Sequence, residues 1–134
     1  MKHHLMPISV VALALASAWL PAPACAGEVI ANPSVSLTAD EVKELFLGDK
    51  QLSGSTKLQP VDNAAAQADF LGKVLQTDAA KYGSRWTKKS FREGLVPPPL
   101  KGSDAEVIAF VKATPGAVGY VMGPAAGAKV LQKY

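Results

Sequence analysis

Histidine and cysteine, the side chains most often used for nucleophilic catalysis and for zinc or copper binding, occur at only three positions in this sequence: His3, His4 and Cys25. All three lie within the first 26 residues. If that segment is removed, the chain has no imidazole and no thiol. This excludes Ser–His–Asp and Cys–His catalysis, a disulfide, and a metal site built from these ligands. We therefore expect no enzymatic activity, no metal and no cofactor.

The first 26 residues have the pattern of a cleavable signal peptide. Lys2 gives a positive start, and the apolar run over 8–20 is shorter than the roughly 20 residues that span a bilayer. Small residues at Ala24–Ala26 match a signal-peptidase site, which places cleavage between Ala26 and Gly27. The sequence thus predicts a signal peptide over 1–26, one domain over 27–134 and a periplasmic location.

Two alternatives stay open for this leader: an uncleaved membrane anchor, or a lipid attached to Cys25. The residues Ala22–Ala24 before the cysteine are a poor context for lipidation. The leader contains one basic and no acidic residue, so 13 basic and 11 acidic residues remain after cleavage, a net charge of +2. This charge is too small to indicate nucleic-acid binding, and no nucleic-acid partner is expected.

Three polar residues are the candidates for binding a small ligand. Thr38 and Asn63 stand at the starts of predicted helices, where free backbone N–H groups can hold an anion. Gln67 follows shortly after Asn63. The alternative role for the first two is helix capping, which needs no ligand. The carboxylates Asp40, Glu41 and Glu44 are interpreted as acidic residues near a helix start that interact with the helix dipole, not as paired acid–base groups.

A run of five basic residues lies between Lys81 and Arg92. It would suit an anion or an acidic partner, but a solvated helix face is the interpretation we favour. Trp86 and Phe91 lie within this run. We expect both to be buried anchors beneath the charged face, and not a stacking platform.

Short apolar runs alternate with helical patterns along the rest of the chain, which predicts an α/β layer structure. Capping boxes begin two of the helices, at Thr38–Glu41 and Ser103–Glu106. Pro60 predicts an edge strand, Gly119 predicts close backbone packing, and the hydroxyl of Tyr120 is expected to find a partner at the sheet edge. The predicted strands are 28–32, 58–61, 117–121 and a last strand or tail at 130–131; the predicted helices begin at 38, 64, 78 and 103; the segments 49–56 and 94–99 are predicted loops.

Two stretches together resemble a known family. They are Leu37–Gly48, which ends in Phe-Leu-Gly, and Ala113–Val121, which contains Pro-Gly-Ala-Val-Gly-Tyr; the region between adds Pro60–Asp62, Phe70, Tyr82 and Trp86. Their order and spacing resemble the periplasmic phosphate-binding-protein-like family, the substrate-binding components of phosphate ABC transporters. The resemblance implies a single lobe of a type 2 periplasmic binding-protein-like fold, with a mixed sheet and flanking helices. It also implies binding of a small oxyanion and association with a periplasmic or membrane-transporter protein.

The sequence departs from the phosphate-binding members of this family at their anion-binding motif. Aligned on Phe70, the position of their arginine is Asp62, and the positions of their Ser-Gly-Thr are Ala66, Gln67 and Ala68. A hydrogen bond to a charged group contributes about 1.5–3 kcal/mol, so these changes should weaken phosphate binding by orders of magnitude. Two functions follow as alternatives. One is a solute-binding, transport-associated protein, and the other is a non-catalytic protein-interaction module that has lost phosphate binding.

Overall fold

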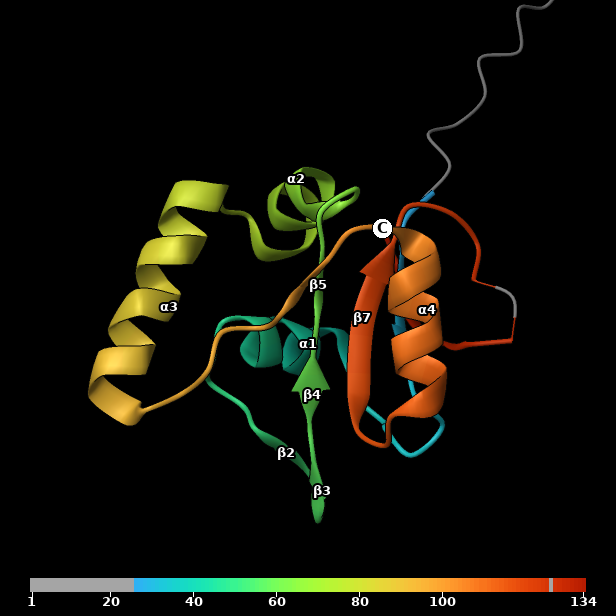
Figure 1. Cartoon of the computed structure of the whole chain (residues 1–134), viewed down its shortest axis with the longest axis horizontal. Coiled ribbons are helices and arrows are strands. Elements are labelled where there is room, and N and C mark those ends of the chain that lie inside the picture. Colours follow the sequence, from blue (N-terminus) through green and yellow to red (C-terminus); the bar gives the residue numbers. More distant parts are fainter. Residues whose placement is uncertain (1–25, 126) are drawn as a thin grey trace, which may run out of the picture.

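The computed structural model describes residues 26–125 and 127–134 (Figure 1). Apart from Ala26, the predicted signal peptide lies outside the described residues. Within the described ranges, no helix is long and apolar enough to cross a bilayer. The elements are β1 Glu28–Ala31, α1 Ala39–Phe46, β2 Leu52–Ser53, β3 Thr56–Lys57, β4 Gln59–Pro60, β5 Asp62–Asn63, α2 Gln67–Phe70, the π-helical turn η1 Leu71–Leu75, α3 Ala79–Glu93, β6 Leu100–Lys101, α4 Asp104–Ala113, β7 Ala117–Val121 and β8 Lys129–Lys133.

A four-stranded mixed sheet forms the centre, in the order β4-β7-β1-β8. β4 runs parallel to β7, whereas β1 runs antiparallel to both of its neighbours. This confirms the predicted mixed sheet, and it confirms that the strand containing Pro60 lies at an edge. Two shorter pairs were not predicted: the hairpin β2–β3, within and just after the expected loop over 49–56, and the parallel pair β5–β6.

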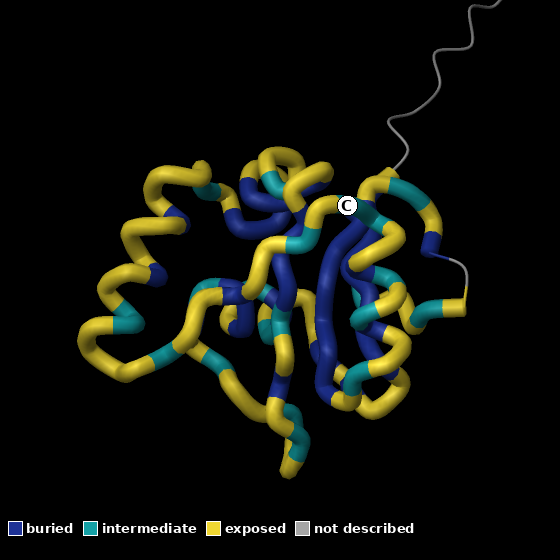
Figure 2. The backbone as a smooth tube through the Cα atoms, in the orientation of Figure 1, coloured by how far each residue is buried: buried dark blue, intermediate teal, exposed yellow. Residues whose placement is uncertain are grey.

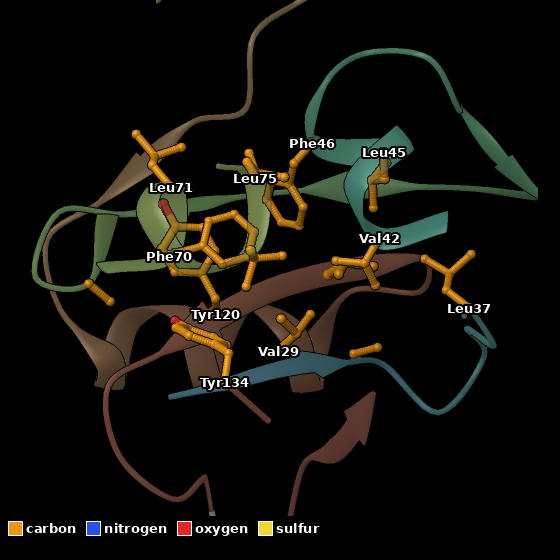
Figure 3. Close-up of a cluster of buried hydrophobic side chains, with 14 of the residues drawn as sticks. Val29, Leu37, Val42, Leu45, Phe46, Phe70, Leu71, Leu75, Tyr120 and Tyr134 are labelled. Atoms are coloured by element: carbon orange, nitrogen blue, oxygen red, sulfur yellow. The ribbon is translucent and has the colours of Figure 1, made fainter. Parts of the chain in front are cut away.

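Side chains of the central strands alternate between two buried clusters, as the period of two of a β-strand requires. On β7, Val118 and Tyr120 face the cluster beneath α1, α2 and η1, while Ala117 and Val121 face the cluster beneath α4. Figure 3 shows the first cluster, in which the Phe70 ring stacks on Tyr120 with centroids 3.9 Å apart. The sheet is therefore covered by helices on both faces.

The helix starts confirm most of the predicted caps. Thr38 and Glu41 form the full capping box of α1, and the Asp78 side chain caps α3. At α4 the box is incomplete, because the Glu106 carboxylate accepts from the backbone of Gly102 and not from Ser103. Gly48 follows α1 with φ +82°, a conformation that favours glycine.

The predicted helix over 64–75 is wrong at its beginning and in its type. Residues 64–66 form a turn after β5, and α2 continues into the π-helical turn η1, which is followed by Gln76 with φ 54°. The start is displaced because Asn63 belongs to β5, where the backbone N–H of Ala64 donates to Lys101. Sequence periodicity does not detect this pairing, since it joins residues far apart in the chain.

Candidate functional site

A groove of about 440 Å³ runs between α3 and the segment 97–100. Asp62 and Gln67 contribute its polar floor, and aromatic and apolar side chains form most of its walls. No lysine or arginine lines it. The lining residues are Asp62, Gln67, Ala79, Tyr82, Gly83, Trp86, Thr87, Ser90, Phe91, Pro97, Pro98 and Leu100.

Asp62 is the only charged residue in the lining, and its residue surface is 3% exposed. The hydroxyl of Tyr82 donates to both carboxylate oxygens, at 3.1 and 2.9 Å, and the hydroxyl of Tyr120 donates to Oδ1 at 2.9 Å. Burial raises the pKa of Asp62 to about 6, against the opposing effect of the two tyrosine hydrogen bonds. The hydroxyl of Tyr120 thus has a partner, but in the interior and not at the sheet edge.

The helix α3 that forms one wall is attached to the body along one side. The indole Nε1 of Trp86 donates to the backbone oxygen of Phe46 at 2.9 Å, and Arg85 donates to Leu47. Asp49 adds ion pairs of 2.8 Å to both Arg85 and Lys89. In Figure 2 most of α3 is exposed, with buried positions only where it faces the body. The opposite side of this helix therefore faces solvent.

A second polar cluster lies where β5 and β7 end. The side-chain Nδ2 of Asn63, which is fully buried, donates to Asp104 Oδ1 at 2.7 Å and to the backbone oxygen of Tyr120. The backbone N–H groups of Met122 and Gly123 also donate to the Asp104 carboxylate, at 3.1–3.4 Å. Three N–H donors thus converge on a carboxylate of the same chain.

The three predicted site residues occupy different environments. Thr38 is exposed, and its hydroxyl accepts from Glu41 as a helix cap. Asn63 does not start a helix: it lies in β5, and its Oδ1 accepts from Ala65. Of the three, Gln67 alone lines the groove. The structure therefore does not bring Thr38, Asn63 and Gln67 together in one site.

Phe91 at the groove and Asp104 in the second polar cluster were not among the predicted site residues. Phe91 was expected in the core, but it is 88% exposed at the groove, because it lies on the side of α3 away from Tyr82 and Trp86. Trp86 is buried as predicted. Asp104 had no sequence signal beyond its place in a helix's first turn, since its partners on Met122 and Gly123 come 18 and 19 positions later.

Comparisons with known proteins show a distant likeness in fold. No protein-family model matches the chain, and no curated protein matches it. Among solved structures, the chain is similar to an ABC-type phosphate transport receptor from Vibrio cholerae, with 15% sequence identity and a TM-score of 0.50. The similarity covers 80% of this chain and 45% of the receptor, so the chain spans less than half of the receptor's length. At this identity, the likeness concerns the fold alone.

Proposed function

We propose that this chain is a non-catalytic binding protein, exported to the periplasm, that works in association with a transport system. Its support is the likeness in fold to a phosphate transport receptor over 80% of the chain. The share of that receptor, 45%, fits a single lobe of a two-lobed binding protein. The groove residues contain a carboxylate but no histidine or cysteine to act as nucleophile or general base.

The proposed mode of binding is contact with a protein, with phosphate binding lost. One observation carries this choice: the groove has the buried carboxylate of Asp62 in its floor and no cation in its walls. An oxyanion placed there would meet a like charge and no opposing one. Exposed apolar side chains at the same groove, Phe91 and Leu100, suit a protein surface better than a hydrated anion.

A second candidate is binding of a small oxyanion, for which the cluster around Asp104 would supply donors only if the Asp104 carboxylate were displaced. Asn63, Met122 and Gly123 already hold a carboxylate there, so their donors suit an oxyanion once Asp104 is absent. Calorimetry with millimolar phosphate or sulfate tests this. Binding heat in Asp104→Ala, with none in the wild type, would show that these donors can hold an oxyanion when the Asp104 carboxylate is removed. Heat in the wild type itself would make oxyanion binding the primary function.

Export is proposed from the leader and fits the edge of the described fold. Gly27 exchanges two backbone hydrogen bonds with Tyr134, at 3.0 and 2.9 Å, beside the pairing of β1 with β8. Cleavage before Gly27 would keep every described strand. Mass spectrometry of the periplasmic fraction should find a chain beginning at Gly27, whereas an intact or lipid-linked Cys25 in a membrane fraction would contradict export as a free protein.

Protein contact is tested by photo-crosslinking in living cells. A photoreactive amino acid at Gln67, which lines the groove, should give a reproducible crosslinked product on irradiation. The matched control is the same amino acid at Lys133, which is exposed on β8, at the opposite edge of the sheet from β4. Equal products at both positions, or none at Gln67, would contradict recognition through this groove.

A further inference from the structure

We propose that the groove and the outward side of α3 together dock an acidic protein segment carrying a large apolar side chain. The apolar side chain enters the groove, and the acidic residues lie along the helix. This rests on the proposed function, because it names the partner chemistry and the surface for protein contact.

The apolar part of this docking surface consists of two exposed residues, Phe91 and Leu100. Phe91 is 88% exposed and Leu100 is 60% exposed. They are two of the six large hydrophobic residues exposed within the described chain. Phe91 and Leu100 face the same groove, whose wall also contains Pro97 and Pro98. Prolines have no backbone N–H, so this wall offers apolar contact and few donors.

The charged part lies on the outward side of α3. Lys81, Lys88 and Arg92 are spaced at i, i+7 and i+11, which places them along one face of the helix. All three are exposed, and within the described ranges none of them forms an ion pair. The other two cations of the run, Arg85 and Lys89, are paired with Asp49 on the body side.

The helix is also fixed in place before any partner arrives. Trp86 and Tyr82 are anchored to Phe46 and Asp62, and the one acidic residue of α3, Glu93, is paired with Lys89. The free cations therefore have no competing carboxylate on their own helix. A pre-positioned surface of this kind loses less entropy on binding than a mobile one does.

The charges distinguish an acidic protein from other occupants. A second copy of the chain meeting this face symmetrically would place the same cations opposite each other, which is repulsive. A membrane-surface helix needs a broad apolar side, but Phe91 is the only large apolar residue on the outward side of α3. An acidic segment with one apolar anchor satisfies both parts of the docking surface.

The experiment is a selection of a random peptide library against the immobilised chain 27–134. We expect enriched peptides to combine acidic residues with a large apolar residue. Their affinity should fall at least about tenfold for Phe91→Ser and for Lys88→Glu/Arg92→Glu. It should be unchanged for the controls Leu52→Ser, another exposed apolar residue, and Lys133→Glu. Circular dichroism of each variant verifies that it is folded.

Several results would overturn the proposal. They are no enrichment, enriched peptides without acidic residues, and binding that the Phe91 and cation variants leave unchanged. Vesicles with anionic lipid that retain the chain in a Phe91-dependent manner would indicate a membrane instead. Dimerisation that depends on Phe91 in sedimentation equilibrium would indicate a second copy. If crosslinking at Gln67 succeeds while this selection fails, protein contact stands and the partner chemistry is wrong.

Discussion

The hydroxyl of Tyr120 donates a 2.9 Å hydrogen bond to the carboxylate of Asp62, 58 positions earlier in the chain. Tyr120 lies on the central strand β7, and the same ring stacks on Phe70 in the main core cluster. A buried acidic side chain is thus built into the core at the position where the resemblance places an arginine. The buried carboxylate of Asp62 is therefore part of the architecture, and it would repel an oxyanion at this position.

Asp62→Asn should change how stability depends on pH. Because burial raises the folded-state pKa of Asp62 to about 6, above its usual value of 3.8, protonation of this group favours the folded state. Its stabilising contribution is complete below about pH 4 and is lost as the pH rises through about 6. Between pH 4 and pH 8 the wild-type protein should therefore lose about 2–3 kcal/mol of unfolding free energy through this group, and Asp62→Asn should not show this loss. Urea unfolding of both proteins from pH 4 to 8 measures it, and parallel profiles would contradict the prediction.

Gly119→Ala should destabilise the sheet against α4. An added Cβ would lie 2.5 Å from Val107 Cγ1, and overpacking of this kind costs about 1–3 kcal/mol. Val107→Ala in the same chain should recover part of the loss, so the double variant should be more stable than the sum of its single effects. Gly83→Ala on α3 is the control: an added Cβ there meets no heavy atom within 4 Å, so this variant should stabilise slightly. If the changes in unfolding free energy caused by Val107→Ala and Gly119→Ala simply add in the double variant, the predicted clash between these two positions is wrong.

Asp104→Ala should destabilise the fold by about 1–3 kcal/mol, because the buried amide of Asn63 and two backbone N–H groups lose their acceptor. Asp104→Asn retains a side-chain oxygen and should lose less. Asp40→Ala, an exposed acidic residue in the first turn of α1, should change the free energy of unfolding by no more than about 0.5 kcal/mol. Equal losses for Asp104→Ala and Asp40→Ala would show that the cluster contributes nothing.

Trp86→Ala should release α3 far more than Asp49→Ala does. The buried indole fills core space and donates to Phe46, so its removal should cost about 3–5 kcal/mol. The Asp49 side chain is 41% exposed in both of its ion pairs. Ion pairs at such exposed positions contribute at most about 1 kcal/mol to stability. Hydrogen exchange over α3 should rise strongly in Trp86→Ala and little in Asp49→Ala. A larger rise in hydrogen exchange for Asp49→Ala than for Trp86→Ala would show that the Asp49 ion pairs, and not the indole, attach α3 to the body.

Local signals in the sequence were sufficient for much of the fold. The capping box at Thr38, the cap at Asp78 and the apolar run of β7 act over a few residues, so spacing alone identifies them. The parallel pairing of β5 with β6 and the link from Asn63 to Asp104 join distant segments, and no periodicity reports them. Phe91 shows the same limit: its type favours burial, but only the orientation of α3 decides which side of the helix meets the body.

The most direct test of the central claim is a calorimetric titration of phosphate into the chain 27–134. Asp62 in the groove and Asp104 among the donors of the second cluster both oppose an added oxyanion. We predict no saturable heat up to millimolar phosphate, with the peptides selected through Phe91 giving heat in the same buffer. A saturable phosphate signal in the wild-type chain would contradict the proposal that this chain recognises a protein and does not bind phosphate.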